Sequence, residues 1–250
     1  MSVKTCLIFW LTITLAAHFG GRCKADLIAN HLGDADPTTE GWTEIPGAGG
    51  GVTVGPINDG GTAAWFVDDN SVADDSTFLY HQTISTTDIA DGNSLGWTLS
   101  TTLRVASDES LSFDGSPFTT YADGTRAWRM FFGLDASGDT QIRLKTGDTT
   151  GPVYTISGNS TYNTFSLRYD PIASSADLFV NGTEVISGYV GELDSQMKVA
   201  WGAGRSPDQG QGNFNKVSFA TVPEPSSTAL CLIACLGICV ARNRRPVLRQ

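Results

Sequence analysis

Strict alternation of apolar and polar side chains over residues 95–107, LGWTLSTTLRVAS, limits the fold of this chain more than any other feature. Successive side chains of a β-strand point to opposite faces, so the apolar residues of an extended stretch share one face. The same period of two recurs in 128–134, 142–144 and 165–169. No stretch of 26–222 has helical periodicity over ten residues. We therefore expect an all-β domain of two packed antiparallel sheets.

Turn-forming residues separate these alternating stretches. Asn181-Gly182, flanked by ADLFV and TEVIS, predicts a two-residue hairpin, because both central residues of that turn need positive φ. Asp135–Asp139, Thr146–Asp148 and Asp170-Pro171 carry the same turn chemistry. The spacing of turns and strands favours a sandwich.

One part of the chain resembles a known family of sandwiches. Phe165-Ser-Leu-Arg-Tyr-Asp-Pro, then Ala176-Asp-Leu-Phe-Val-Asn-Gly, then Trp201-Gly-Ala-Gly, is similar to the C-terminal half of the concanavalin A-like lectins and glucanases, especially the laminin G-like branch. The resemblance rests on turn chemistry and not on a ligand site. It implies a two-sheet antiparallel jelly-roll sandwich and, by analogy only, carbohydrate as a ligand.

The C-terminus, residues 223–250, has three parts in fixed order. Pro223-Glu224-Pro225 precedes an uncharged apolar run, 226–241, and a basic end, 242–250. The run would span roughly 24 Å as a helix, a little under the ~30 Å hydrocarbon core of a bilayer. This order resembles the PEP-CTERM sorting tail of bacterial exported proteins. The resemblance implies a transient inner-membrane helix and processing by an exosortase-type transpeptidase; the alternative is an ordinary C-terminal membrane anchor.

The N-terminus, residues 1–25, has the layout of a secretory signal peptide. A basic Lys4 precedes an apolar run from Cys6 to Ala17, and small residues before Asp26 favour cleavage after Ala25. An uncleaved signal anchor is the alternative. We expect the secretion machinery to export the protein and one domain, 26–222, to reach the cell surface or extracellular matrix.

Composition restricts the partners of that domain. All five cysteines lie in 1–25 and 223–250, so the domain has none to form a disulfide. It contains nine Lys and Arg against 25 Asp and Glu, a net charge of −16. Nucleic acid is not an expected partner, because binding it needs a basic face. An acidic surface leaves calcium binding open.

Residues that could carry chemistry are few. Glu192 and Asp194 approach the carboxylate motif of the glycosidases of this superfamily but lack the second glutamate, so we predict no catalytic residues. His31 and His81 have no Cys or His neighbour at zinc-ligand spacing. No phosphate loop or nucleophile elbow occurs.

Two sets of side chains are candidate binding groups. Tyr121, Arg126 and Trp128 have the composition of a glycan contact, through ring stacking and forked hydrogen bonds. An aromatic core strand with solvated arginines is the alternative. For calcium, the densest acidic cluster is the candidate, and solvated turn residues are the alternative. Its members are Asp68, Asp69, Asp74 and Asp75.

The sequence therefore predicts a non-enzymatic exported β-sandwich that binds extracellular polysaccharide or has a structural role. The rival hypothesis is a glycoside hydrolase or lyase of the concanavalin A-like fold, with Glu192 or Asp194 among its acids. Geometry distinguishes them, because a hydrolase needs two free carboxyl groups facing one cleft.

Overall fold

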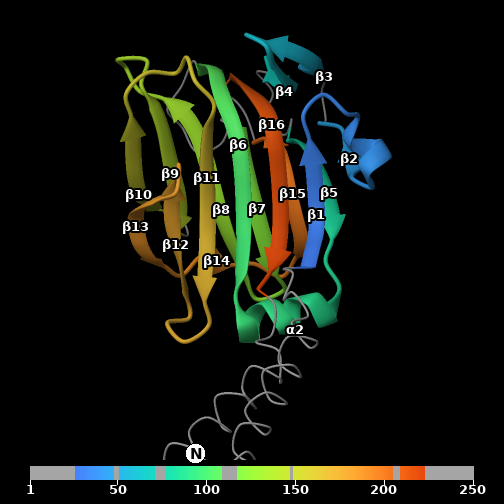
Figure 1. Cartoon of the computed structure of the whole chain (residues 1–250), viewed down its shortest axis with the longest axis vertical. Coiled ribbons are helices and arrows are strands. Elements are labelled where there is room, and N and C mark those ends of the chain that lie inside the picture. Colours follow the sequence, from blue (N-terminus) through green and yellow to red (C-terminus); the bar gives the residue numbers. More distant parts are fainter. Residues whose placement is uncertain are drawn as a thin grey trace, which may run out of the picture. The chain divides into compact units, whose positions relative to one another are not determined.

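Two antiparallel sheets lie face to face and enclose one apolar core (Figure 1). The computed structural model describes residues 26–47, 51–70, 77–108, 117–146, 149–204 and 209–222. The range Asp26–Val222 is a compact unit of its own. The all-β sandwich expected from the alternating sequence is confirmed. The predicted signal peptide, 1–25, and sorting tail, 223–250, lie outside the described residues.

The first sheet, called sheet A, has a path of seven strands with an eighth beside it. In spatial order these are β13 (Thr183–Tyr189), β12 (Ser175–Val180), β11 (Asn163–Asp170), β6 (Trp97–Asp108), β16 (Gly210–Thr221), β4 (Thr62–Asp69) and β3 (Val52–Asp59). The remaining strand, β1 (Asp26–Leu32), pairs with β16.

The second sheet, called sheet B, is built in the same way. Its order is β10 (Thr149–Ile156), β9 (Thr140–Thr146), β8 (Arg126–Leu134), β7 (Pro117–Asp123), β15 (Met197–Ala203), β5 (Phe78–Thr83) and β2 (Thr43–Ile45). The short β14 (Glu192–Leu193) pairs with the beginning of β8. Neighbours on β5, β15 and β7 are far apart in sequence, which is typical of a jelly roll.

The core is dominated by aromatic rings from the inward faces of both sheets. Trp97 of sheet A contacts Tyr121 and Trp128 of sheet B, with ring centroids 4.9 and 5.1 Å apart. Trp201 packs 4.8 Å from Phe214 of the opposite sheet. Each fully buried side chain of this size stabilises the fold by roughly 1.5–3 kcal/mol. A cysteine-free domain is thus held by packing.

Two turn features show how the sequence fixes local structure. The Asn181-Gly182 hairpin is confirmed, since φ is 49° at Asn181 and 84° at Gly182 between β12 and β13. At Asp135–Asp139 the carboxylate of Asp135 accepts from the amides of Ser137 and Asp139, which closes the β8–β9 turn. Both turns are built from the residues that the sequence marked.

The helix α2 (Thr86–Leu95) was not expected, because the sequence shows no helical periodicity there. Only Ile89 and Gly92 of this helix are buried, so almost no apolar stripe exists to detect. Ser85 caps its start by accepting from the amide of Asp88. A single 3-10 turn, η1 (Pro37–Glu40), follows β1.

No helix in the described part of the chain is long and apolar enough to cross a membrane.

Candidate functional site

The outward face of sheet B has an unusual centre, which follows from the strand register. Since Tyr121, Trp128 and Trp201 point into the core, their neighbours on the same strands point outward. Register aligns three outward rows across β5, β15, β7 and β8. In the order β5, β15, β7, β8, the first row is Leu79, Gly202, Phe118 and Phe131. The middle row is His81, Ala200, Thr120 and Arg129. The third row is Thr83, Lys198, Ala122 and Ala127. Small residues, Gly202, Ala200, Thr120 and Ala122, occupy four of the six middle positions of these rows.

A cavity of about 490 Å³ lies over this centre, and we call it the sheet-B groove. Five strands of sheet B, β5, β7, β8, β9 and β15, and the loop before β15 supply most of its lining. The lining residues are Thr77, Leu79, Phe118, Thr120, Arg129, Phe131, Lys145, Gln196, Lys198 and Gly204. Its size falls in the range of small-molecule sites in proteins.

The floor of the groove is partly apolar. Leu79, Phe118, Phe131 and Ala200 form a second apolar cluster, separate from the core between the sheets. The rings of Phe118 and Phe131 stack with centroids 5.9 Å apart. This cluster lies on the side of sheet B that faces away from the core between the sheets, and its members are 0–8% exposed.

One polar group on the floor has no partner. The side chain of Thr120 is 4% exposed, and its hydroxyl makes no hydrogen bond within the described part of the chain. It lies between Ala200 and Arg129 in the middle row. A buried hydroxyl without a partner costs about 1–3 kcal/mol. A ligand oxygen at this point would remove that cost.

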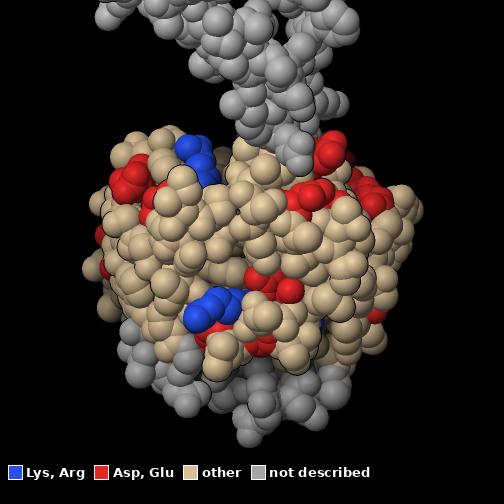
Figure 2. Space-filling view, turned by 90° about the horizontal axis from the view of Figure 1, so that it is seen from below, with Lys and Arg blue, Asp and Glu red and all other residues tan. Residues whose placement is uncertain are grey.

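Three basic side chains contribute to the lining of the groove. Lys145, Lys198 and Arg129 come from three different strands. Burial lowers the pKa of Lys198, an effect that the charge of Asp194 partly opposes. Seen from the end of the domain that carries α2, acidic side chains are scattered and basic ones few (Figure 2). The groove thus gathers positive charge on an acidic domain.

Arg129 is not free to bind a ligand. Its Nη1 donates to Glu192 Oε1 and its Nη2 donates to Asp194 Oδ2, so both ends of the guanidinium are occupied. The side chains of Glu192 and Asp194 are 8% and 12% exposed. Arg129 therefore holds the segment around β14 against the edge of the groove.

Tyr189 supports the same wall from the other sheet. Its hydroxyl donates to the carbonyl of Lys145 at 2.6 Å and accepts from the amide of Arg129 at 3.1 Å. Burial raises the pKa of Tyr189 to about 12, so it stays a donor at neutral pH. The last residue of β13 in sheet A thus fixes the backbone of β8 and β9 in sheet B.

Comparison with known proteins identifies the family. A family model described as the Vibrio cholerae sialidase, lectin insertion, matches residues 78–224, which include every strand that lines the groove. The chain belongs to this family. Sialidases of two strains of Vibrio cholerae serotype O1 are 26% identical to it over 196 residues. That alignment covers 76% of this chain and 23% of each sialidase, so the chain spans about a quarter of their length.

A solved structure supports the fold of this lectin-insertion domain. A carbohydrate esterase from the Shiga toxin-encoding bacteriophage phi24B superposes with a TM-score of 0.55 at 9% sequence identity. The superposition covers 79% of this chain and 99% of the esterase chain. At this identity the likeness concerns the fold alone.

The glycan contact predicted from Tyr121, Arg126 and Trp128 is not assembled in this lectin-insertion domain. Tyr121 is 0% exposed and Trp128 is 2% exposed, because both point into the core. The alternative, an aromatic core strand, is what forms. Arg126 is exposed, and its Nη1 donates to the carbonyl of Val190 at 3.1 Å. The prediction was wrong for the two rings because period two does not tell which face of a strand is enclosed.

The acidic candidates also have other roles. Glu192 and Asp194 bind one guanidinium and do not face each other across an open cleft. Asp68 accepts from Asn70 at 2.9 Å and Asp69 is buried, while Asp74 and Asp75 lie outside the described residues. Among the residues that the structure describes, no group of three His, Cys, Asp or Glu could hold a metal ion.

The groove residues were missed, although one signal was present. Phe131 stands between Met130 and Phe132, where the alternation of β8 calls for a polar residue. A strand that is apolar on both faces can contribute to two apolar clusters. In β8, Met130 and Phe132 belong to the core between the sheets and Phe131 belongs to the outward cluster. Thr120 and Lys198 gave no such signal, since only the register of long-range strand pairs brings them together.

Proposed function

We propose that the domain Asp26–Val222 is a carbohydrate-binding module that binds a glycan in the sheet-B groove. The observation that carries the proposal is the buried, unpartnered hydroxyl of Thr120 on the floor of an open groove. Membership of a sialidase lectin-insertion family supports the choice of carbohydrate over other ligands.

The chemistry of the groove suits a sugar ring. A pyranose has an apolar face of C–H groups and a rim of hydroxyls. The apolar cluster that includes Phe118 and Phe131 offers a surface for the face. Thr120 and Gln196 offer donors and acceptors to the rim. A mixed floor of this kind selects neither purely apolar nor purely polar ligands.

The binding proposal is tested on a glycan array with the purified full-length protein. We expect binding to a subset of glycans, reduced about tenfold in Thr120→Val, which keeps the shape but removes the hydroxyl. The matched control is Thr98→Val on the outward face of sheet A. No binding to any glycan, or equal losses in both variants, would contradict the proposal.

We also infer that the domain is not an enzyme. The two carboxylates that most resemble a catalytic pair are both bound to Arg129, and a retaining or inverting glycosidase needs one of them free to protonate the leaving group. The test measures whether the protein releases reducing sugar from any glycan that the array identifies. Turnover that is abolished in Glu192→Gln would refute this inference.

Delivery is a separate part of the proposal. We propose export by the signal peptide 1–25, cleavage after Ala25, and sorting of the tail 223–250 by an exosortase-type transpeptidase. The mature domain would then act at the cell surface or in the extracellular matrix. Replacing Pro223, Glu224 and Pro225 with alanine should retain the full-length protein in the membrane fraction. Unchanged release would refute processing at that triplet.

A further inference from the structure

We propose that a cleft at the margin of the sandwich binds an extended, basic segment of a partner protein, which adds as a strand to the open edge of β1. This inference goes beyond the proposed glycan binding, because it concerns the margin where β1 meets sheet B and not the outward face of sheet B. The ligand is a peptide backbone that carries positively charged side chains.

This cleft, which we call the edge cleft, has a volume of about 600 Å³. It lies where β1 of sheet A meets β2 and β5 of sheet B (Figure 1). Within the described part of the chain, β1 pairs only with β16 and β2 only with β5, so each has one unpaired edge. An unpaired edge offers backbone N–H and C=O groups to another chain. The lining residues are Leu27, Ile28, Asn30, Glu40, Gly41, Thr43, Gln82 and Thr83.

Side chains already occupy one end of the β1 edge. The amide of Leu32 donates to Glu40 Oε1 at 3.0 Å, and the carbonyl of Asn30 accepts from Trp42 Nε1 at 3.0 Å. The N–H and C=O of one residue point to the same side of a strand, so the Asn30 amide also faces this edge. It makes no hydrogen bond among the residues that the structure describes. From Asp26 to Asn30 the edge is therefore open to a short added strand.

The charge around the edge cleft favours a basic segment. Residues 26–103 contain twelve Asp and Glu and no Lys or Arg. Two lysines lie on neighbouring strands, since Lys198 pairs with Thr83 and Lys216 with Leu32. They are outnumbered by the carboxylates of the β1–β2 region, because opposite these two lysines stand Asp26, Asp34, Asp36, Glu40 and Glu44. Complementary charge selects partners and speeds their association, so a cationic segment fits this margin.

Glu40 supplies a fixed negative charge in the lining of the cleft. Its Oε2 lies 2.6 Å from Nδ1 of the buried His31, and its Oε1 accepts from the amide of Leu32. Burial lowers the pKa of His31 below 6.5, so at neutral pH the imidazole does not cancel the charge of the carboxylate. A carboxylate held in this way can accept a charge-assisted hydrogen bond from a Lys or Arg side chain.

Apolar side chains in the same lining suit the other residues of an added strand. Leu27 is 58% exposed, and Ile28 is partly buried against the core. Successive side chains of a strand point to opposite faces, so a bound segment presents alternate residues to two different surfaces. We therefore expect a segment in which basic and apolar residues alternate.

The test uses three probes with the purified full-length protein: a short peptide of alternating lysine and valine, the same peptide with glutamine in place of lysine, and spermidine. We expect the lysine peptide to bind at least about tenfold more tightly than the glutamine peptide. It should also slow hydrogen exchange of the Asn30 amide, because that amide would gain a carbonyl partner. Spermidine has no carbonyl and should leave this exchange unchanged.

Leu27→Lys places a cation in the edge cleft at an exposed position and should weaken binding of the lysine peptide about tenfold. The matched control is Ile172→Lys, which makes the same change of charge at a 95% exposed residue between β11 and β12 and should leave the affinity unchanged. Absent or equal binding of the two peptides, equal losses in the two variants, or unchanged exchange at Asn30 would overturn this inference. None of these results bears on glycan binding in the sheet-B groove.

Discussion

The outward faces of the two sheets use the same residue types with opposite results. On sheet A, Ser100 bonds Ser166 and Thr102 bonds Thr164, each at 2.9 Å, so hydroxyls on neighbouring strands pair with one another. On sheet B, the hydroxyl of Thr120 is buried beside an apolar cluster and has no partner in the described residues. These outward hydroxyls of sheet A hydrogen-bond to one another, whereas the outward hydroxyl of Thr120 on sheet B has no partner among the described residues. This difference is the reason why we propose sheet B, and not sheet A, as the binding face.

Of the substitutions that test the difference between the two sheets, Arg129→Met has the largest expected effect. In Arg129→Met, Glu192 and Asp194 would remain mostly buried without a counterion, and we expect a loss of about 3 kcal/mol in the free energy of unfolding. Chemical denaturation measures it. The control on sheet A is Arg168→Met, which removes a guanidinium 3.9 Å from the ring centroid of Phe179 and should cost less than about 1 kcal/mol. Similar losses in the two variants would show that the ion pairs of Arg129 stabilise the fold no more than the contact between Arg168 and Phe179 does.

Two valine substitutions compare how much the outward hydroxyls of the two sheets contribute to stability. Thr120→Val should leave the free energy of unfolding unchanged or raise it by about 1 kcal/mol, because it removes a buried group without a partner. Thr102→Val should lower it by about 0.5–1.5 kcal/mol, because Thr164 loses its partner. Thermal unfolding of both variants provides the measurement, and a destabilised Thr120→Val would mean that its hydroxyl is already bonded.

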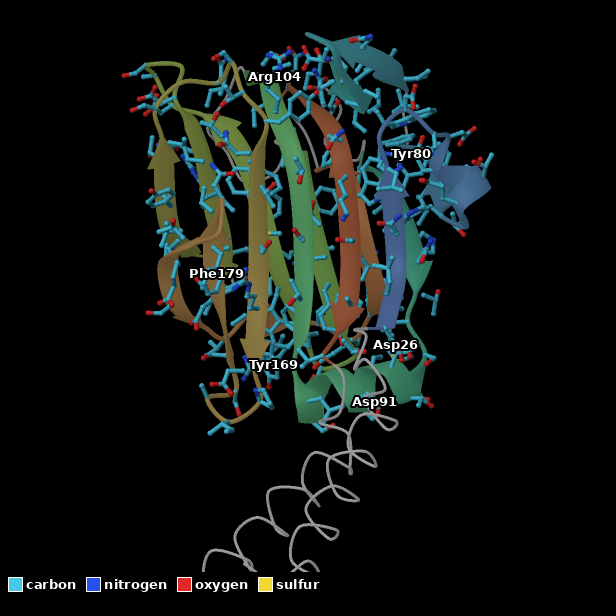
Figure 3. The ribbon with its side chains drawn as sticks, viewed as in Figure 1. Asp26, Tyr80, Asp91, Arg104, Tyr169 and Phe179 are labelled. Carbon is cyan, nitrogen blue, oxygen red and sulfur yellow. The ribbon has the colours of Figure 1, made fainter. Side chains whose placement is uncertain are left out.

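Acid pH should affect sheet A through Asp59. This carboxylate accepts from Arg104 Nε at 2.5 Å, and also from Tyr162 and Asn213, which holds its pKa below the usual 3.8. Arg104 lies at the end of sheet A opposite α2 (Figure 3). A lowered pKa means that the stabilisation is complete above 3.8 and is lost as the pH falls through the folded value. Asp59→Asn should flatten this acid limb in denaturation curves.

Alkaline pH should affect sheet B through Lys198, and more weakly. Burial places its folded pKa below the usual 10.5, so the unfolded chain binds that proton more tightly. Stability contributed by this group therefore rises as the pH passes from the folded value toward 10.5. Lys198→Met should abolish this rise in denaturation curves recorded across that pH range, and an unaltered profile would show that Lys198 does not cause it.

Local sequence predicted much of the fold and little of the groove. The alternation around Trp97 and the Asn181-Gly182 turn are properties of contiguous residues, so the strand and the hairpin were both predicted correctly. The groove depends on β5, β15 and β7 lying side by side, although they are separated along the chain. Thr120 and Lys198 become neighbours only through that pairing. Tyr121 was misassigned because an aromatic residue on a strand suits a core as well as a ligand.

The two hydrogen bonds of the Tyr189 hydroxyl have a consequence for the edge of sheet A. Its strand, β13, is the outermost of sheet A, and an outermost strand presents free backbone groups that can recruit another chain. The hydroxyl of Tyr189 fastens the end of β13 to β8 and β9 of the opposite sheet. Fraying of this margin would then require breaking contacts in both layers. With no cysteine between 26 and 222, no disulfide can link the two sheets here, and the two hydrogen bonds of Tyr189 provide a non-covalent link at this edge.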